Sequence, residues 1–324
     1  MDACNDCECG KLMKNSNFGC VPTIEVTHKL IFQSTFDSAG NRNRVLLTDV
    51  LNQAYFDAMI NHADPTKRWY PTPAFKNIND VRGENKSFEF DDQTTEFLAE
   101  GARRFEGMIP GISGSGANSA QMKSIIESVR CGDYSVYAVT VKNQLAGNLS
   151  SDGLGIEGVE IDEQSISAMF VKKTNTTPQH LLTSFNWSQI TGDDRLRVID
   201  CGEVGGANLM ALRGLFEVCY DLLEITTTTL KLRLRTLFGT EKNPITVDGL
   251  VAADFVSSDS GATSKIFNET DNADVSITGV TENPDGTYEL TFAAQDAGDI
   301  LIPFAKKTGY DFTCMKDSPV DVSS

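Results

Sequence analysis

Four cysteines near the start of the chain are the residues whose type and spacing first suggest chemistry. Cys4, Cys7, Cys9 and Cys20 follow the pattern C-x2-C-x-C-x10-C. Four thiolates can close a tetrahedral Zn²⁺ site, but structural zinc usually joins two separated pairs of ligands, whereas three of these are crowded together. We therefore expect free thiols that pack against a neighbouring molecule and no bound cofactor, with Zn²⁺ at these cysteines as the alternative.

The other cysteines are expected to be reduced. The chain opens without the basic region and the apolar core of about 7–15 residues that mark a secretory signal, and stable disulfides are rare in a reducing cytosol. Free thiols or a metal site are therefore expected ahead of cross-links. The remaining cysteines are scattered and are expected to be buried as small apolar residues; they are Cys131, Cys201, Cys219 and Cys314.

Other patterns that would support catalysis are weak. The glycine-rich stretch GISGSGAN lacks the lysine and the strand–helix context that cradle a phosphate, so we interpret it as a connector. No histidine has a neighbouring Ser, Cys or Asp in a known catalytic pattern; the three are His28, His62 and His180. The acidic pairs Asp91–Asp92 and Asp193–Asp194 fit surface turns better than a glycosidase site. The sequence therefore predicts no catalytic, cofactor-binding or metal residues and no enzyme, with a carboxylate-dependent hydrolase as a remote alternative.

Composition and charge limit the partners. The chain has 324 residues and a formal net charge of −17, and this acidity argues against a surface that grips nucleic acid. No apolar run approaches the roughly 20 residues needed to span a bilayer, so no membrane partner is expected. Residues 247–324 hold fourteen Asp and Glu against four Lys, a net −10. Such asymmetry predicts a separate, well-solvated C-terminal module.

The first strand is expected to be half-buried. Residues 24–33 alternate between apolar and polar side chains. The apolar face is predicted to carry Ile24, Val26, His28, Leu30 and Phe32, and the solvent face Glu25, Thr27, Lys29 and Gln33. His28 is interpreted as a hydrogen-bonded core histidine.

Helices and antiparallel strands are predicted to alternate in the rest of the body, which is typical of an α+β fold that is mainly antiparallel β. Helices are expected over residues 48–62, with Thr48 as the N-cap, over 118–130 and over 206–224. The last of these is apolar around most of its circumference and should be buried. Strands are expected within residues 87–110, 133–141, 160–173, 180–190 and 225–238.

Two groups of residues are predicted to contact other subunits. Trp69 and Tyr70 lie in the proline-rich stretch DPTKRWYPTP, which suggests an extended, anchored loop. Lys231, Arg233 and Arg235 alternate with leucines and share one strand face. Like charges about 7 Å apart repel unless carboxylates stand opposite them. We expect those acids to come from the next subunit, with an ordinary solvated strand face as the alternative.

The C-terminal residues predict a small β module. Short strands and turns follow residue 247, and Pro-Asp-Gly in ENPDGTY is a strong hairpin signal. The predicted layout is a Cys-rich arm (1–22), an oligomerising α+β body (23–241), an immunoglobulin-like β-sandwich (247–316) that folds independently, and a tail (317–324).

The order of these features resembles a known class of protein. The Cys-rich start, the stretches NFGCVPTIEVTHKLIF and SFEFDDQTTEFLAEGARRFEG, and the immunoglobulin-like tail look like virion structural proteins of tailed bacteriophages. The nearest likeness is to proteins of crAss-like and related phages of gut Bacteroidetes. It covers the chain as a layout, and residues 17–32 are its most specific part. The resemblance implies a β-sandwich or barrel body with helices, as in tail-tube and ring subunits, whose arms reach onto adjacent subunits and whose outer surface carries the immunoglobulin-like module.

The same resemblance implies function and place. The chain would be a non-enzymatic virion subunit that is assembled in the bacterial host cytoplasm into a homo-oligomeric tail tube, ring or collar. Its partners would be copies of itself and other virion proteins, and DNA would pass without specific binding. The alternative from a different class is a carbohydrate-binding or host-surface adhesion module. Only Tyr288 and Tyr310 would be available in the sandwich to stack on sugars, which counts against it.

Overall fold

The structure, a computed structural model, describes residues 24–322 apart from 112–122, 124–125, 128, 189–194, 241–242 and 259–260. The described chain is mainly antiparallel β with few helices, which confirms the predicted fold class. The chain divides into two compact units, Met1–Gly214 and Leu215–Ser324. The N-terminal cysteine group, and with it the zinc alternative, lies outside the described residues, as does most of the helix predicted over 118–130.

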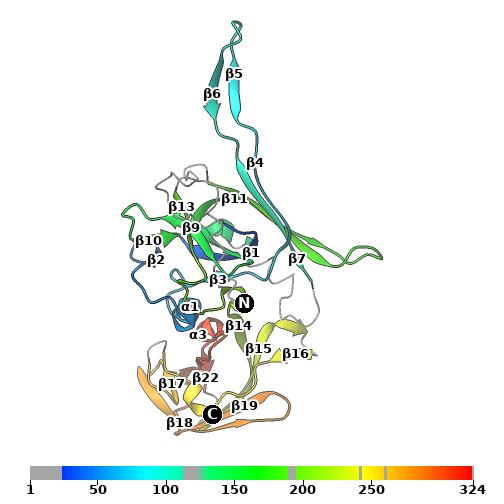
Figure 1. The fold of residues 1–324 in the computed structure, drawn as a ribbon. Coiled ribbons are helices and arrows are strands. Elements are labelled where there is room, and N and C mark those ends of the chain that lie inside the picture. Colours follow the sequence, from blue (N-terminus) through cyan, green and yellow to red (C-terminus); the bar gives the residue numbers. More distant parts are fainter. Residues whose placement is uncertain are drawn as a thin grey trace. The chain divides into compact units, whose positions relative to one another are not determined.

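Among the residues that the structure describes, the N-terminal unit consists mainly of strands, with the helix α1 and short 3-10 turns (Figure 1). Its elements are β1 (Thr27–Ser34), β2 (Val45–Leu46), α1 (Gln53–Ile60), β3 (Tyr70–Pro71), β4 (Lys76–Arg82), β5 (Lys86–Glu89), β6 (Thr95–Ala99), β7 (Arg103–Pro110), β8 (Tyr134–Thr140), β9 (Leu145–Leu149), β10 (Gly155–Glu157), β11 (Val159–Val171), β12 (His180–Trp187) and β13 (Leu196–Ile199). The strands predicted around residues 133–141, 160–173 and 180–190 are confirmed as β8, β11 and β12.

One antiparallel sheet forms the frame of this unit. Its strands run in the order β2-β10-β9-β8-β11-β12-β7-β4, and β1 pairs with both β8 and β3. Aromatic side chains fill the core: the rings of Phe105 and Phe185 stack with centroids 5.0 Å apart, and Phe32 meets Phe185 edge-on. β4 pairs only with β7, so it is an edge strand of this sheet.

The first predicted helix is present but begins later than its sequence suggests. α1 starts at Gln53, and the side chain of Asn52 accepts a hydrogen bond of 2.9 Å from the backbone N–H of Tyr55. Asn52 therefore caps the helix where Thr48 was predicted to do so, because asparagine also satisfies the free N–H groups of a first helical turn.

The C-terminal unit consists of strands around one apolar core (Figure 1). Its elements are β14 (Phe216–Ile225), β15 (Thr229–Thr240), β16 (Asn243–Thr246), β17 (Lys265–Asn268), β18 (Ala273–Glu282), β19 (Thr287–Phe292), β20 (Ile300–Ile302), β21 (Tyr310–Asp311), α3 (Thr313–Lys316) and β22 (Val320–Asp321). The sheet order is β21-β14-β15-β19-β18-β17-β20-β22, with β16 beside β15. The predicted hairpin at ENPDGTY is confirmed: it joins β18 to β19, and Gly286 supplies the positive φ of +73° that its turn requires.

The helix predicted over residues 206–224 is wrong. Residues 209–211 form a single 3-10 turn, and β14 runs from Phe216 to Ile225. β14 pairs along its length with β15, and a bulge between Leu222 and Glu224 shifts its register. The bulge interrupts the strict alternation that would identify a strand, so the apolar run mimics a buried helix.

The division between the units falls at Leu215, not near residue 247. β15, which the sequence places in the body, pairs with β19 of the predicted C-terminal module. Among the short strands and turns predicted after residue 247, the segment DGLVAADF contains a 3-10 turn at residues 252–254. The immunoglobulin-like assignment stays a prediction.

The prediction that Cys219 and Cys314 are reduced is wrong in this structure. They form a disulfide across 95 residues of sequence, with Cα atoms 5.2 Å apart, within the usual range for a bonded pair. Cys201 is also disulfide-bonded. The Cys219–Cys314 bond joins β14 to α3. The fold brings these two thiols together, although their spacing in the sequence does not predict a disulfide.

The predicted solvent face of β1 is wrong at Lys29 and Gln33, which are 4% and 1% exposed. The Nζ of Lys29 donates a 2.6 Å hydrogen bond to the carbonyl of Leu212, and the Nε2 of Gln33 donates a 2.8 Å bond to the carbonyl of Lys67. Their partners lie 183 and 34 residues away in sequence, so the alternation within the strand could not reveal them.

The buried Lys29 is expected to make stability depend on pH. Burial, with a smaller contribution from the charge of Arg213, lowers the pKa of Lys29 to about 8, whereas an unfolded lysine titrates near 10.4. Between about pH 8 and pH 10 the unfolded chain binds more protons than the folded chain, so Lys29 makes stability rise with pH by about 2–3 kcal/mol. Urea unfolding of the wild type and Lys29→Met at several pH values should show this rise in the wild type alone. The exposed Lys306→Met is the control and should show the same rise as the wild type; parallel profiles for all three proteins would contradict the prediction.

Candidate functional site

A two-stranded ribbon that leaves the main sheet is the most distinctive surface feature of the N-terminal unit. Among the described residues, β5 and β6 pair only with each other, and Figure 1 shows them (cyan) standing beyond the other strands of their unit. We call residues 83–102 the arm. It continues β4 and β7, whose last paired residues are Arg82 and Arg103. A Cβ on Gly101 would lie 2.0 Å from the carbonyl oxygen of Gly83, so the two backbones approach closely where the arm begins.

Charged and aromatic side chains hold the base of the arm to the core. The Nε and Nη2 of Arg103 donate hydrogen bonds of 2.8 and 2.7 Å to the two carboxylate oxygens of Asp80. The indole Nε1 of Trp187 donates a 3.0 Å bond to the same carboxylate, and the Arg103 guanidinium lies 5.4 Å from the Trp187 ring centroid. Because Trp187 belongs to the buried core, the direction of the arm is set by a firm base.

The arm exposes large apolar side chains on both of its faces. The exposed fractions are 53% for Phe88, 44% for Phe90, 58% for Phe97 and 60% for Leu98. Phe88 and Phe90 meet edge-on with centroids 5.0 Å apart, while Phe97 lies opposite Ser87 on the other face. A two-stranded hairpin alone in water is marginally stable at best. The arm therefore carries apolar surface that its own chain leaves uncovered.

The arm is also acidic. Residues 83–102 contain six acidic residues and one lysine, a net −5. Asp92 lies in the turn at the tip, and hydrogen bonds from the side chain and the backbone N–H of Thr94 lower the pKa of its carboxyl. The Asp91–Asp92 pair thus forms part of an exposed turn, as the sequence predicted, while Asp193–Asp194 lies outside the described residues.

The predicted basic stripe lies opposite carboxylates of its own chain. Lys231, Arg233 and Arg235 occupy β15, whose alternating leucines are fully buried, as predicted. Asp221 faces Arg233 in register and also accepts a 2.9 Å bond from the Nε of Arg235. Glu224 and Glu289 flank Lys231 on the two neighbouring strands. Because these acids are intramolecular, the stripe does not need a second subunit to balance its charge.

Trp69 is not available as a subunit contact in this fold. It is fully buried, and its ring centroid lies 5.7 Å from that of Phe56 and 5.2 Å from that of Tyr137. Tyr70 is half-buried, and its hydroxyl donates a 3.0 Å bond to the carbonyl of Pro65. The aromatic pair anchors the proline-rich segment to its own unit.

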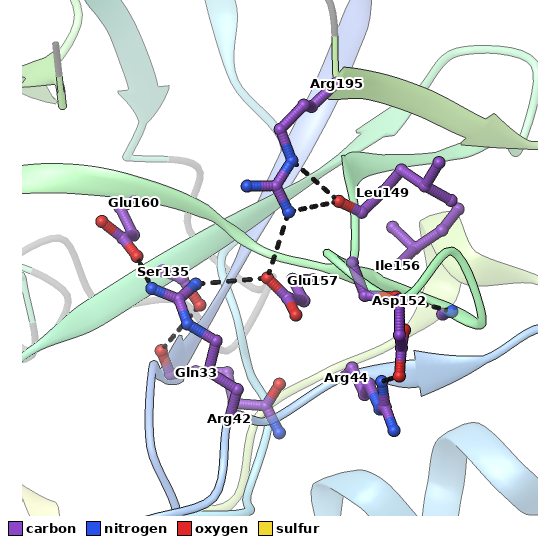
Figure 2. Close-up of polar contacts among 12 residues, drawn as sticks. Gln33, Arg42, Arg44, Ser135, Leu149, Asp152, Ile156, Glu157, Glu160 and Arg195 are labelled. Carbon is purple, nitrogen blue, oxygen red and sulfur yellow. Dashed lines mark hydrogen bonds and ion pairs between the residues drawn. The ribbon is translucent and has the colours of Figure 1, made fainter. Parts of the chain in front are cut away.

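A network of ions surrounds one buried carboxylate (Figure 2). Glu157, only 6% exposed, lies 3.2 Å from Nη1 of Arg42 and 3.9 Å from Nη2 of Arg195. Arg42 also pairs with Glu160, and Arg195 donates two bonds to the carbonyl of Leu149. With two cations on one buried acid, breaking either contact is costly, so the network fastens these segments together. Every charge in it is engaged, which suits a structural role.

Two carboxyls, each beside a second carboxyl, have raised pKa values. Burial and the charge of Asp133 raise the pKa of Glu163, and burial and the charge of Asp311 raise that of Glu217. Asp133 and Glu217 are exposed. An exposed carboxylate stays hydrated, so neither pair has the desolvated setting that a general acid requires.

Ligand and membrane signals are lacking in the part of the chain that the structure describes. No group of three or more His, Cys, Asp or Glu there is arranged to hold a metal ion. No helix among these residues is long and apolar enough to cross a membrane. Tyr288, one of the two tyrosines that could stack on sugars in a carbohydrate-binding module, is fully buried, and its hydroxyl donates a hydrogen bond to the carbonyl of Val247. This counts against the carbohydrate-binding alternative.

Comparison of the chain with protein-family models, curated proteins and solved structures found no match. The class of protein therefore rests on the fold and on its surfaces. The sequence predicted the two strands of the arm, but it did not predict that their apolar side chains would be exposed. One signal was present: Phe88, Phe90, Phe97 and Leu98 are interleaved with acidic residues between two glycines, which is unusual for strands inside a sheet.

Proposed function

We propose that the chain is a non-enzymatic virion structural protein, a self-assembling subunit of a phage tail tube, ring or collar. The observation that supports it best is the arm, which presents four large apolar side chains to solvent from a firmly held base. Burying one such side chain is worth about 1.5–3 kcal/mol, so contact with a further protein surface would stabilise both partners. Copies that contact each other through different surfaces form rings or tubes.

Sedimentation of the full-length protein tests this proposal. We expect the 35.3 kDa chain to form closed or tubular oligomers as its concentration rises, visible by electron microscopy. A variant in which Asn-Gly replaces residues 84–101 should stay monomeric, because it lacks the apolar surface. Its thermal transition should change little, since Gly83 and Ala102 are already hydrogen-bonded to each other.

A second variant separates the arm's apolar surface from its length. Phe88→Ser, Phe90→Ser, Phe97→Ser and Leu98→Ser together keep every backbone residue, and they should weaken assembly as the truncation does. Normal oligomers from the truncated chain would overturn the proposal that the arm drives assembly.

A further inference from the structure

The arm needs a partner surface that is both apolar and basic. Its net charge of −5 disfavours acidic surfaces, and its exposed aromatic side chains favour apolar ones. Nucleic acid and anionic lipid would repel it. Such a surface lies on the N-terminal unit of this same chain.

The surface is a row of side chains across the outer face of the main sheet. Strand register places Met169 of β11 opposite Leu182 of β12, Leu182 opposite Met108 of β7, and Met108 opposite Lys76 of β4. Residues directly opposite each other in neighbouring strands share a face. Met169 is 53% exposed, Leu182 and Met108 are half-buried and Lys76 is exposed. Methionine adapts its shape to an incoming side chain.

Two lysines lie just beyond the end of β11, a few residues from Met169 along the chain. Lys172 and Lys173, both exposed, follow β11 directly, and the residues from 164 to 182 include no Asp or Glu. We define the basic row as Met108, Leu182, Met169, Lys76, Lys172 and Lys173. It combines three positive charges with an apolar centre, so it matches the arm in both properties.

The two surfaces lie toward opposite ends of β7. The arm leaves beside Arg103, where β7 begins, whereas Met108 lies near the end of β7, at Pro110, which pairs with His180 of β12. Because β4 and β7 remain paired as far as Arg82 and Arg103, the arm points away from the basic row of its own copy. Only another copy can bring an arm to this row.

We infer that the arm of one copy docks on the basic row of a second copy of this chain. The inference rests on the proposed function and names the surface that receives the arm. The contact joins two different surfaces. Each copy can therefore dock its arm on one neighbour and bind the arm of another neighbour on its basic row, so the assembly closes into a ring or continues as a filament. The acids of the arm face Lys172 and Lys173, while Phe97 and Leu98 cover the methionines.

Charge reversal in the full-length chain tests the contact. Lys172→Glu with Lys173→Glu should weaken self-association by about tenfold or more, measured by sedimentation equilibrium, since attraction becomes repulsion at two positions. Glu89→Lys with Asp91→Lys should do the same and leaves the Asp92–Thr94 bonds of the tip intact. Mixing the two variants should restore association, because one then supplies a basic arm and the other an acidic row. Arg197→Glu with Lys306→Glu removes the same charge from two exposed sites elsewhere and should leave association unchanged.

A photo-crosslink locates the partner surface directly. Benzoylphenylalanine at position 97 in an unlabelled chain, mixed with chain labelled with ¹⁵N, should link to labelled peptides that contain Met108, Met169 or Leu182. If arm truncation abolishes assembly while the lysine reversal has no effect and crosslinks fall elsewhere, the basic row is not the docking surface and the proposed function stands. A wild type that remains monomeric at all concentrations overturns both.

Discussion

Replacing Cys219 and Cys314 together with serine is expected to lower the free energy of unfolding of the C-terminal unit by about 3–5 kcal/mol. The disulfide closes a loop of 95 residues, and a cross-link across so long a loop removes much of the conformational entropy of the unfolded chain. It ties β14, near the start of the unit, to α3, near its end. The bond therefore keeps these two segments together even when the unit unfolds.

Thermal unfolding with and without reductant measures this effect. Because 1 kcal/mol shifts the Tm of a domain of this size by about 4–8 °C, a fall of about 15 °C or more is expected for the double serine variant. Reductant should lower the Tm of the C-terminal unit in the wild type by a similar amount, whereas it should not change the Tm of this unit in the variant. Equal Tm values for wild type and variant under oxidising conditions would show that the bond contributes nothing.

The cysteine pairing illustrates what the sequence could not provide. Eight cysteines allow 105 complete pairings, and the sequence predicted free thiols or a metal site ahead of any of them. The bond depends on β14 pairing in parallel with β21, which is a contact between distant parts of the chain. A local pattern carries no information about such contacts.

Local patterns succeeded where one strand face is buried and the other is solvated. β15 alternates Leu230, Leu232 and Leu234, all fully buried, with three cations, and it was predicted from that alternation. β1 failed in part because both of its faces are covered, so Lys29 and Gln33 are buried against backbone carbonyls. Alternation identifies a strand, but it does not tell how many layers cover it.

The candidate site was harder to predict than the fold. Trp69 and Tyr70 were predicted to contact another subunit because aromatic residues among prolines suggest an anchored loop. In the structure these two residues hold that loop to their own unit. The arm, in contrast, has ordinary strand composition. Its exposure follows from pairing, because β5 and β6 have no further neighbouring strand in the part of the chain that the structure describes. Only the three-dimensional arrangement reveals this.

Cutting the chain at residue 247 is expected to abolish folding of the C-terminal fragment, although the sequence predicted a module that folds alone from there. A fragment of residues 247–316 lacks β14 and β15, and so loses Val218, Leu230, Leu232 and Leu234 from the core. Truncating a single buried leucine costs about 2–5 kcal/mol, while a whole domain is stable by only about 5–15 kcal/mol. Removing three leucines, a valine and the partner strand of β19 therefore exceeds what the remainder can withstand.

The fragment Leu215–Ser324 supplies the matched comparison. It retains the complete sheet, the core and the Cys219–Cys314 bond, so it should unfold cooperatively in urea and give well-dispersed amide resonances. The shorter fragment should show neither property, and Leu232→Ala in the longer one should cost about 2–5 kcal/mol, since Leu232 is fully buried. Cooperative unfolding of residues 247–316 alone would mean that the pairing of β15 with β19 is not needed for the fold, and that the boundary lies where the sequence first placed it.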